Sequence, residues 1–181
     1  DGRCDRQGRF VFGTLDERPC RDAIASFYRL NLDLSLERLP LPPIAISNSI
    51  CFSVDGTAMY FCDSMKKAIY RWDDYLGGDA SRVRVFAVLD PGPGAADGAT
   101  IDAHDHLWSA QWGAGRVLRF APDGSVERAI TLPVSQPSCV SLGGPHYDEL
   151  FVTTAQESLT PAQLAGEPLA GGLFHARQPG L

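Results

Sequence analysis

A short pattern recurs along this chain, and it constrains the possible folds more than any other feature. Each copy holds a polar turn, an apolar run, a second turn and a partner run. The apolar runs begin at Phe10, Met59, Leu107 and Leu150, which lie 49, 48 and 43 residues apart. The runs alternate with a period of two and are bounded by Gly and Pro, which favours strands over helical repeats. A repeat of roughly 40 to 50 residues with about four short strands in each copy is typical of a β-propeller.

The repeats predict one all-β domain, a propeller with about four blades that spans residues 1–181. The innermost strand that we expect before Cys4 is absent, so the first unit is predicted to begin inside a blade. The chain is therefore expected to be a fragment that lacks the first blades of a larger ring. Within Ser158–Leu169, Thr160 suits a helix N-cap and Pro161 a first helical position, which predicts a short surface helix between strands.

Charge and cysteine content limit the classes of function. A net charge of −6 and a pI near 5.1 argue against nucleic acid or an anionic membrane as the main partner. We find no apolar run of the roughly 20 residues that a membrane span needs, and no apolar segment of a secretory leader. The five cysteines show no CxxC spacing and are odd in number, which favours reduced, structural thiols and a cytoplasmic location. Oligomeric state is not indicated.

Two oxygen-bearing side chains hold matching positions in neighbouring units. Asn48 precedes the predicted strand 50–53, and Asp97 is the second-last residue of the predicted loop 90–98, before a strand at 99–101. They lie 49 residues apart, close to one repeat, and equivalent positions of adjacent blades converge on the propeller axis. Amide and carboxylate oxygens suit a hard divalent cation such as Ca²⁺, Mg²⁺ or Mn²⁺. Hydrogen bonding within turns is the alternative role for both residues.

Several phrases of the sequence resemble the senescence marker protein / gluconolactonase / regucalcin family. They are SNSICFSVDGTAMYFCDS and ADGATIDAHDHLWSAQWGAGRVLRF, with DGRCDRQGRFVFGTLDE at the start and GGLFHA near the end. The resemblance covers essentially the whole chain. It implies a six-bladed propeller that hydrolyses sugar lactones with one divalent cation (Ca²⁺, Zn²⁺, Mn²⁺ or Mg²⁺). It also implies that Asn48 and Asp97 are metal ligands, that Asp97 is the general base, and that a third ligand, a glutamate, lies upstream.

The same resemblance implies two substrate-binding residues and one departure. Asp1 matches the Asp of the family's Asn-Asp-Gly phrase, and Glu17 matches an acidic position that reaches substrate hydroxyls. The alternative for both is a solvated carboxylate in a turn or at a strand end. Ser49 replaces the glycine of the usual Ser-Asn-Gly-Leu phrase, which matters if that position has φ > 0 or lies close to the metal.

The leading functional hypothesis is metal-dependent hydrolysis of an aldonolactone, such as gluconolactone or arabinonolactone, to the aldonic acid. The cation would polarise the lactone carbonyl, and Asp97 would accept the proton of the attacking water. No GxSxG motif is present to support a serine-hydrolase mechanism. The alternatives are a non-catalytic propeller that binds calcium or a protein partner, and an inactive fragment.

Overall fold

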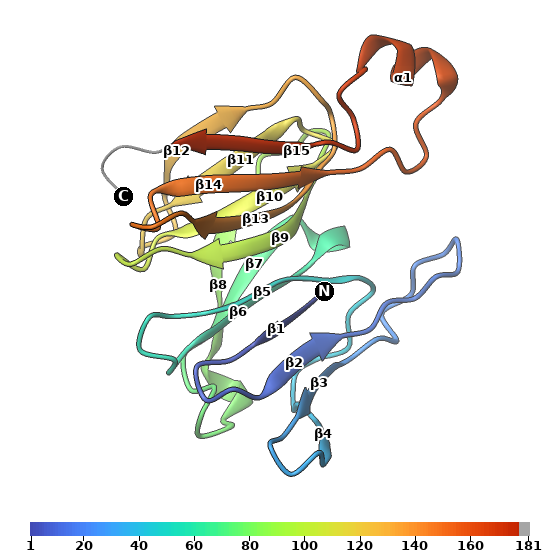
Figure 1. The fold of residues 1–181 in the computed structure, drawn as a ribbon. Helices are drawn as coiled ribbons and strands as arrows, with labels where there is room; N and C mark the ends of the chain where they lie inside the picture. The colour runs from blue at the N-terminus through green and yellow to red at the C-terminus, as the bar shows by residue number, and fades with distance from the viewer. Residues whose placement is uncertain (178–181) are drawn as a thin grey trace. The chain divides into compact units, whose positions relative to one another are not determined.

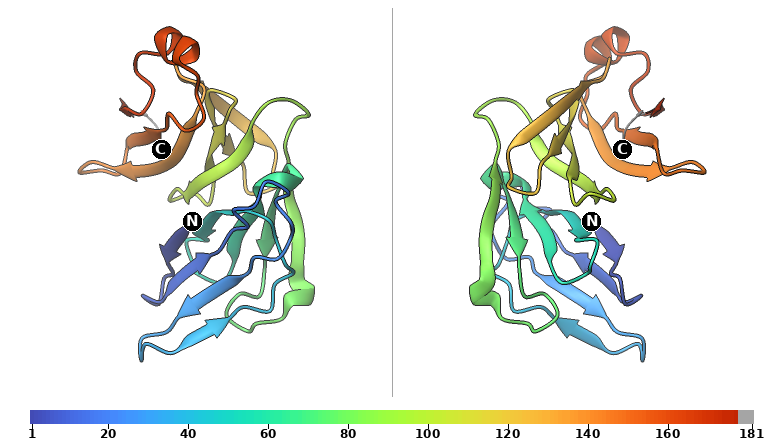
Figure 2. Two further views of the ribbon diagram at one scale, coloured as in Figure 1. Left: turned by 90° about the vertical axis from the view of Figure 1, so that its right-hand side faces the viewer. Right: turned by 90° about the vertical axis from the view of Figure 1, so that its left-hand side faces the viewer.

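The computed structural model describes residues 1–177, which form fifteen strands in four antiparallel sheets (Figure 1). The chain divides into two compact units, Asp1–Asp90 and Pro91–Leu181. Two sheets belong to each unit, and each unit is described by itself below. Figure 2 gives two further views of the strands and of the short helix α1.

The first unit contains two four-stranded sheets, ordered β1-β2-β3-β4 and β5-β6-β7-β8. Their strands are β1 (Gly2–Cys4), β2 (Phe10–Gly13), β3 (Phe27–Leu30), β4 (Leu36–Arg38), β5 (Ser47–Phe52), β6 (Met59–Asp63), β7 (Ala68–Trp72) and β8 (Val83–Val88). Two 3₁₀ turns, η1 (Ser64–Lys66) and η2 (Ala80–Arg82), lie before β7 and β8.

The second unit contains a four-stranded sheet, ordered β12-β11-β10-β9, and a three-stranded sheet, ordered β13-β14-β15. Its elements are β9 (Ala95–Ile101), β10 (Leu107–Trp112), β11 (Arg116–Phe120), β12 (Val126–Thr131), β13 (Pro137–Gly143), β14 (Glu149–Thr154), α1 (Pro161–Gly166) and β15 (Leu173–Arg177).

Every sheet follows the chain in an up-and-down order, so its first strand lies at one edge. These sheets are the blades of the predicted β-propeller, and the fold class is confirmed. The prediction that the first sequence repeat lacks its innermost strand was wrong, because that strand is present as β1, Gly2–Cys4. This strand pairs with Phe10–Phe12 of β2. With three residues and no run of apolar side chains, it leaves almost no pattern in the sequence.

Each unit has its own apolar core. In the first unit the core joins both sheets through Phe27 of β3 and Phe61 of β6, whose rings meet edge to face with centroids 5.0 Å apart. In the second unit the core includes Trp108 of β10 and Leu150 of β14, both fully buried. The large side chains that alternate along these strands therefore face a neighbouring sheet, which is why strand periodicity was visible in the sequence.

A polar residue recurs at the turn between the first two strands of three sheets. Asp5, Ser53 and Asp102 lie 48 and 49 residues apart. The Asp102 carboxylate accepts the backbone N–H groups of His104 and His106, and the Asp5 carboxylate binds its own turn in the same way. Ser53 instead accepts a backbone N–H through its hydroxyl. These buried side chains form the turns and account for part of the repeat.

The predicted helix is confirmed as α1, which lies on the connection between β14 and β15 (Figure 2). Thr160 caps it by accepting the N–H of Gln163, and the Gln163 side chain accepts the N–H of Thr160. Pro161 occupies the first turn, where its missing N–H costs nothing. Among the described residues, no helix is long and apolar enough to cross a membrane.

Candidate metal and substrate site

Asn48 lies in a β-bulge near the start of β5. Asn48 pairs with Cys62 and Cys51 pairs with Tyr60, so the two residues between them, Ser49 and Ile50, share one partner position on β6. Asn48 was expected to precede its strand and instead lies inside it, as the second residue. Bulges of this kind redirect side chains and are frequent beside functional sites.

Ser49 has a positive φ angle, the condition under which its replacement of the family's usual glycine matters. Its φ is +57°, in the left-handed region, and the residue is fully buried. A residue with a Cβ pays about 1 to 2 kcal/mol for this conformation, whereas glycine pays almost nothing. The serine therefore introduces strain directly beside Asn48, which the structure around it must hold.

Asp97 lies in a matching bulge in β9. Ala96 pairs with Gln111 and Ala99 pairs with Ser109, so Asp97 and Gly98 share one partner position on β10. The prediction that 90–98 is a loop was wrong at its end, because β9 begins at Ala95. Gly and Pro in this stretch suggested a loop, whereas pairing with β10 extends the strand, and pairing is a tertiary property.

Gly98 is required by the close approach of β13. A Cβ at this position would lie 2.4 Å from Sγ of Cys139 and 2.8 Å from its Cα. The second distance involves backbone, so a rotamer change at Cys139 would not relieve the contact. The bulge that carries Asp97 is therefore packed directly against the first strand of the next sheet.

We expect Gly98→Ala to destabilise the protein by about 2 to 3 kcal/mol, because overpacking of this kind forces backbone shifts. Gly166→Ala is the matched control, since a Cβ there would meet nothing within 4 Å. Urea unfolding of both variants measures the difference. Equal midpoints for Gly98→Ala and the wild type would show that β13 can move away without cost.

Asp97 and Asn48 each have side-chain chemistry that suits a divalent cation. Asp97 is half-buried, and burial raises the pKa of its carboxyl to about 6. A divalent cation at its oxygens would offset that loss of hydration. The Asn48 amide nitrogen donates to the Ser64 hydroxyl at 3.0 Å, so the other amide atom, Oδ1, is the one suited to a cation. Asn48 belongs to the first unit and Asp97 to the second.

The first unit brings Asp1 and the loop of Glu17 to the start of β5. The Asp1 carboxylate accepts the backbone N–H of Ile50 at 2.9 Å. Glu17 is exposed in the loop between β2 and β3, and this loop is fixed to the start of β5 by the bridge between Leu15 and Ile46. Three predicted site residues, Asp1, Glu17 and Asn48, thus lie at one end of the unit. Their contacts with a substrate stay predictions.

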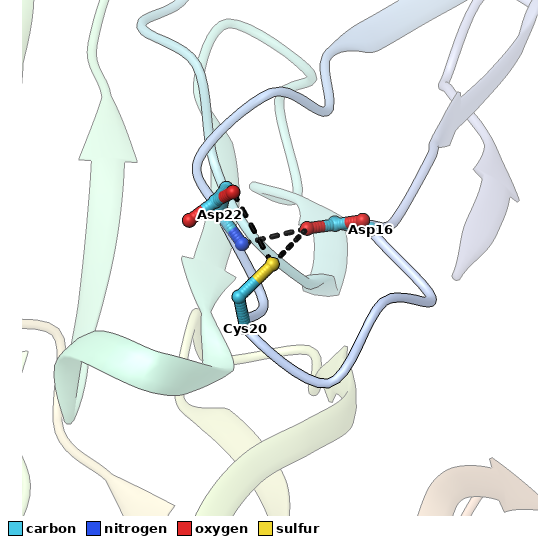
Figure 3. A group of neighbouring side chains, drawn as sticks. All are labelled: Asp16, Cys20 and Asp22. Atoms are coloured by element: carbon cyan, nitrogen blue, oxygen red, sulfur yellow. Dashed lines mark hydrogen bonds between the residues drawn. The ribbon is translucent and has the colours of Figure 1, made fainter.

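Sequence reasoning missed a cluster in the same loop, formed by Asp16, Cys20 and Asp22 (Figure 3). The Cys20 thiol donates to Asp22 at 3.2 Å, and the Asp22 N–H donates to Asp16 at 2.7 Å. Arg18 binds both carboxylates, at 2.8 and 2.9 Å, and its hydrogen bonds hold the pKa of Asp16 well below its usual range. The guanidinium already neutralises the acidic pair, so we read the cluster as a structural element that orders the Glu17 loop.

Antiparallel sheets that each follow the chain in up-and-down order define a class, the β-propellers, and Asn48 and Asp97 each lie in a bulge of the first strand of their own blade. The family model described as SMP-30/Gluconolactonase/LRE-like region matches residues 1–156. The chain therefore belongs to the SMP-30/gluconolactonase/LRE-like family, and the resemblance seen in the sequence is confirmed.

One curated relative and two solved structures show which members of the family this chain is similar to. L-arabinolactonase of Azospirillum brasilense is 50% identical over 179 residues, which cover 98% of this chain and 59% of that protein. Among solved structures, a calcium-binding protein, regucalcin, from Agrobacterium tumefaciens matches with a TM-score of 0.87 and 32% identity, over 97% of this chain and 59% of its own. A gluconolactonase from Xanthomonas campestris matches with a TM-score of 0.70 and 25% identity, over 84% and 52%. The chain thus spans about 60% of the length of its curated relatives.

Proposed function

We propose that this protein hydrolyses a sugar lactone to the corresponding aldonic acid with the help of a divalent cation. The observation that carries the proposal is Asp97, a half-buried carboxyl with a pKa near 6 in the bulge of β9. A general base is most effective when its pKa lies near the working pH, and burial moves Asp97 in that direction. The 50% identity to an L-arabinolactonase supports the reaction class.

The proposed roles follow the chemistry of each side chain. Asp97 accepts the proton of the water that attacks the lactone carbonyl, and its carboxylate would also hold a cation. Asn48 would hold a cation through Oδ1, since its amide nitrogen is engaged by Ser64. Glu17, held near the start of β5 by its ordered loop, accepts hydrogen bonds from substrate hydroxyls. When bound, the cation supplies Lewis-acid polarisation of the carbonyl.

The substrate we propose is a neutral five- or six-carbon aldonolactone, with L-arabinonolactone tested first. The relative with that activity is 50% identical, whereas the matched gluconolactonase structure is 25% identical. Gluconolactone is the second substrate. The ratio of the two rates shows how ring size and hydroxyl stereochemistry affect hydrolysis.

The test is lactone hydrolysis by the protein expressed from its complete open reading frame. The reaction is monitored through the protons that it releases in weakly buffered solution. We expect EDTA to lower the rate at least about 100-fold, and Ca²⁺, Zn²⁺, Mn²⁺ or Mg²⁺ added back in excess to restore it. Turnover that persists after EDTA treatment and dialysis would contradict the role of the cation. Hydrolysis of no aldonolactone by the metal-loaded protein would contradict the proposed reaction.

One observation favours a second candidate function. The structure with a TM-score of 0.87 is described as a calcium-binding protein. In that alternative the chain binds Ca²⁺ without catalysis, and the same assay separates the two, because Ca²⁺ affinity without hydrolysis supports only the second. A single propeller domain completed by upstream blades, and a cytoplasmic location, stay predictions.

A further inference from the structure

Both backbone polar groups of Ile50, in the β5 bulge, bond to side chains of Asp1, which precedes β1, and of Arg3 in β1. Asp1 Oδ2 accepts the N–H of Ile50 at 2.9 Å, and Arg3 Nε donates to the carbonyl oxygen of Ile50 at 3.1 Å. The other oxygen of Asp1 accepts the N–H of Gly2 at 2.7 Å, which fixes the carboxylate to its own strand. The bulge removes Ile50 from regular pairing with β6, and these two side chains engage both its polar groups.

The backbone conformation of the bulge requires stabilising contacts of this kind. Ser49 sits in the left-handed region with φ +57°, which a residue with a Cβ keeps only when its surroundings fix it. The bulge of β9 differs, because its equivalent flexible residue is Gly98, which has no such φ and is packed against Cys139. Close packing against Cys139 thus supports the β9 bulge, and hydrogen bonds with Asp1 and Arg3 support the β5 bulge.

We propose that Asp1 is a positioning residue for the metal ligand Asn48. Together with Arg3 it holds the Ser49–Ile50 bulge, which follows Asn48 directly and sets the direction of its side chain. Ser64 then fixes the amide itself through the 3.0 Å hydrogen bond to Nδ2. The cation in this inference rests on the proposed function. In this role Asp1 acts through the backbone and does not touch the lactone.

The first experiment needs no cation. In the metal-free protein from the complete reading frame, Asp1→Ala should speed hydrogen exchange of the Ile50 amide at least about 10-fold, measured by NMR. Asp1→Asn should restore most of the protection, because its amide oxygen still accepts the N–H. Asp33→Ala is the control, since Asp33 is exposed and bonds only within its own turn. Unchanged Ile50 exchange in Asp1→Ala would overturn the proposal.

The second experiment measures Ca²⁺ affinity by calorimetry. Asp1→Ala should weaken it about 10-fold, the effect expected when support for a metal ligand is lost. In a Ser49→Gly background the loss should shrink to about 3-fold or less, because glycine adopts the bulge without strain. At saturating Ca²⁺ the KM for the lactone should be unchanged.

The outcomes separate this inference from the others. An Asp1→Ala protein with normal Ca²⁺ affinity and a raised KM would show direct substrate contact and overturn the positioning role. A wild-type protein that binds no divalent cation would contradict the proposed function. The Ile50 exchange result would still decide whether Asp1 holds the bulge.

Discussion

Replacing Asp97 by Asn should lower kcat/KM for L-arabinonolactone by about 10³-fold or more in the protein expressed from its complete reading frame. The substitution keeps the shape of the side chain but removes its capacity to accept a proton, a step that contributes about 10² to 10⁴-fold. It also replaces a carboxylate by a neutral ligand, so Ca²⁺ affinity should fall as well. Steady-state kinetics and calorimetry measure the two effects separately.

The control is Asp123→Asn, which removes the same charge from an exposed turn of the same unit. It should change kcat/KM by less than about 2-fold and leave Ca²⁺ affinity unchanged. Asp97→Asn that keeps more than a tenth of the wild-type activity would exclude Asp97 as general base. Loss of Ca²⁺ affinity with normal hydrolysis would leave it as a ligand only.

Asp102→Ala should cause the largest loss of stability, about 3 to 5 kcal/mol. Asp102 is buried and its Oδ2 accepts hydrogen bonds from Nε and Nη2 of Arg119, at 3.0 and 2.7 Å, and from Nε1 of Trp108 at 3.0 Å. Removing Asp102 leaves Nε and Nη2 of Arg119 and Nε1 of Trp108 buried without this acceptor, and among the described residues only Glu127, which pairs with Nη1, then remains as an ion-pair partner of Arg119. Breaking a buried charged network in this way has costs of this size. Arg119 is only 5% exposed, so bulk water does not solvate its guanidinium in the folded protein.

The same network predicts how stability depends on pH. Burial alone would raise the pKa of Asp102, but the hydrogen bonds from Arg119 and Trp108 outweigh it and hold this pKa below its usual range. Its contribution is therefore complete above the unfolded value of about 3.9 and is lost as the pH falls further. The wild type should lose stability below about pH 4 more steeply than Asp102→Ala.

Thermal and urea unfolding at pH 7 and at pH 3.5 test both expectations. Asp123→Ala serves as the control, since its carboxylate is exposed and bonds only to Ser125. It should cost less than about 1 kcal/mol. If Asp102→Ala unfolds at the same midpoint as this control, the network contributes nothing to stability. Parallel pH profiles for Asp102→Ala and the wild type would show that another group causes the acid dependence.

Much of the fold could be predicted because each blade repeats one pattern of turns and apolar strands. The runs at Phe27–Leu30 and Met59–Asp63 lie where the alternation places them, and Thr160 with Pro161 marks the start of α1. Short strands without apolar alternation were missed: β1 and β4 have three residues each, and neither contains a fully buried side chain. Pairing with a longer neighbour holds such strands, and one segment alone carries no trace of it.

For the candidate site, the sequence by itself determined the spacing: Asn48 and Asp97 lie one repeat apart. The family resemblance predicts a glycine where Ser49 stands, and the chemical roles of Asn48 and Asp97 stay predictions. Only the tertiary structure decided how they are held. The bulges depend on pairing with β6 and β10, and the strain at Ser49 is balanced by side chains 46 and more residues away in the chain. Local residues set the propensity of a segment to form a strand, but contacts between strands set its register. The register in turn determines the direction in which each side chain points.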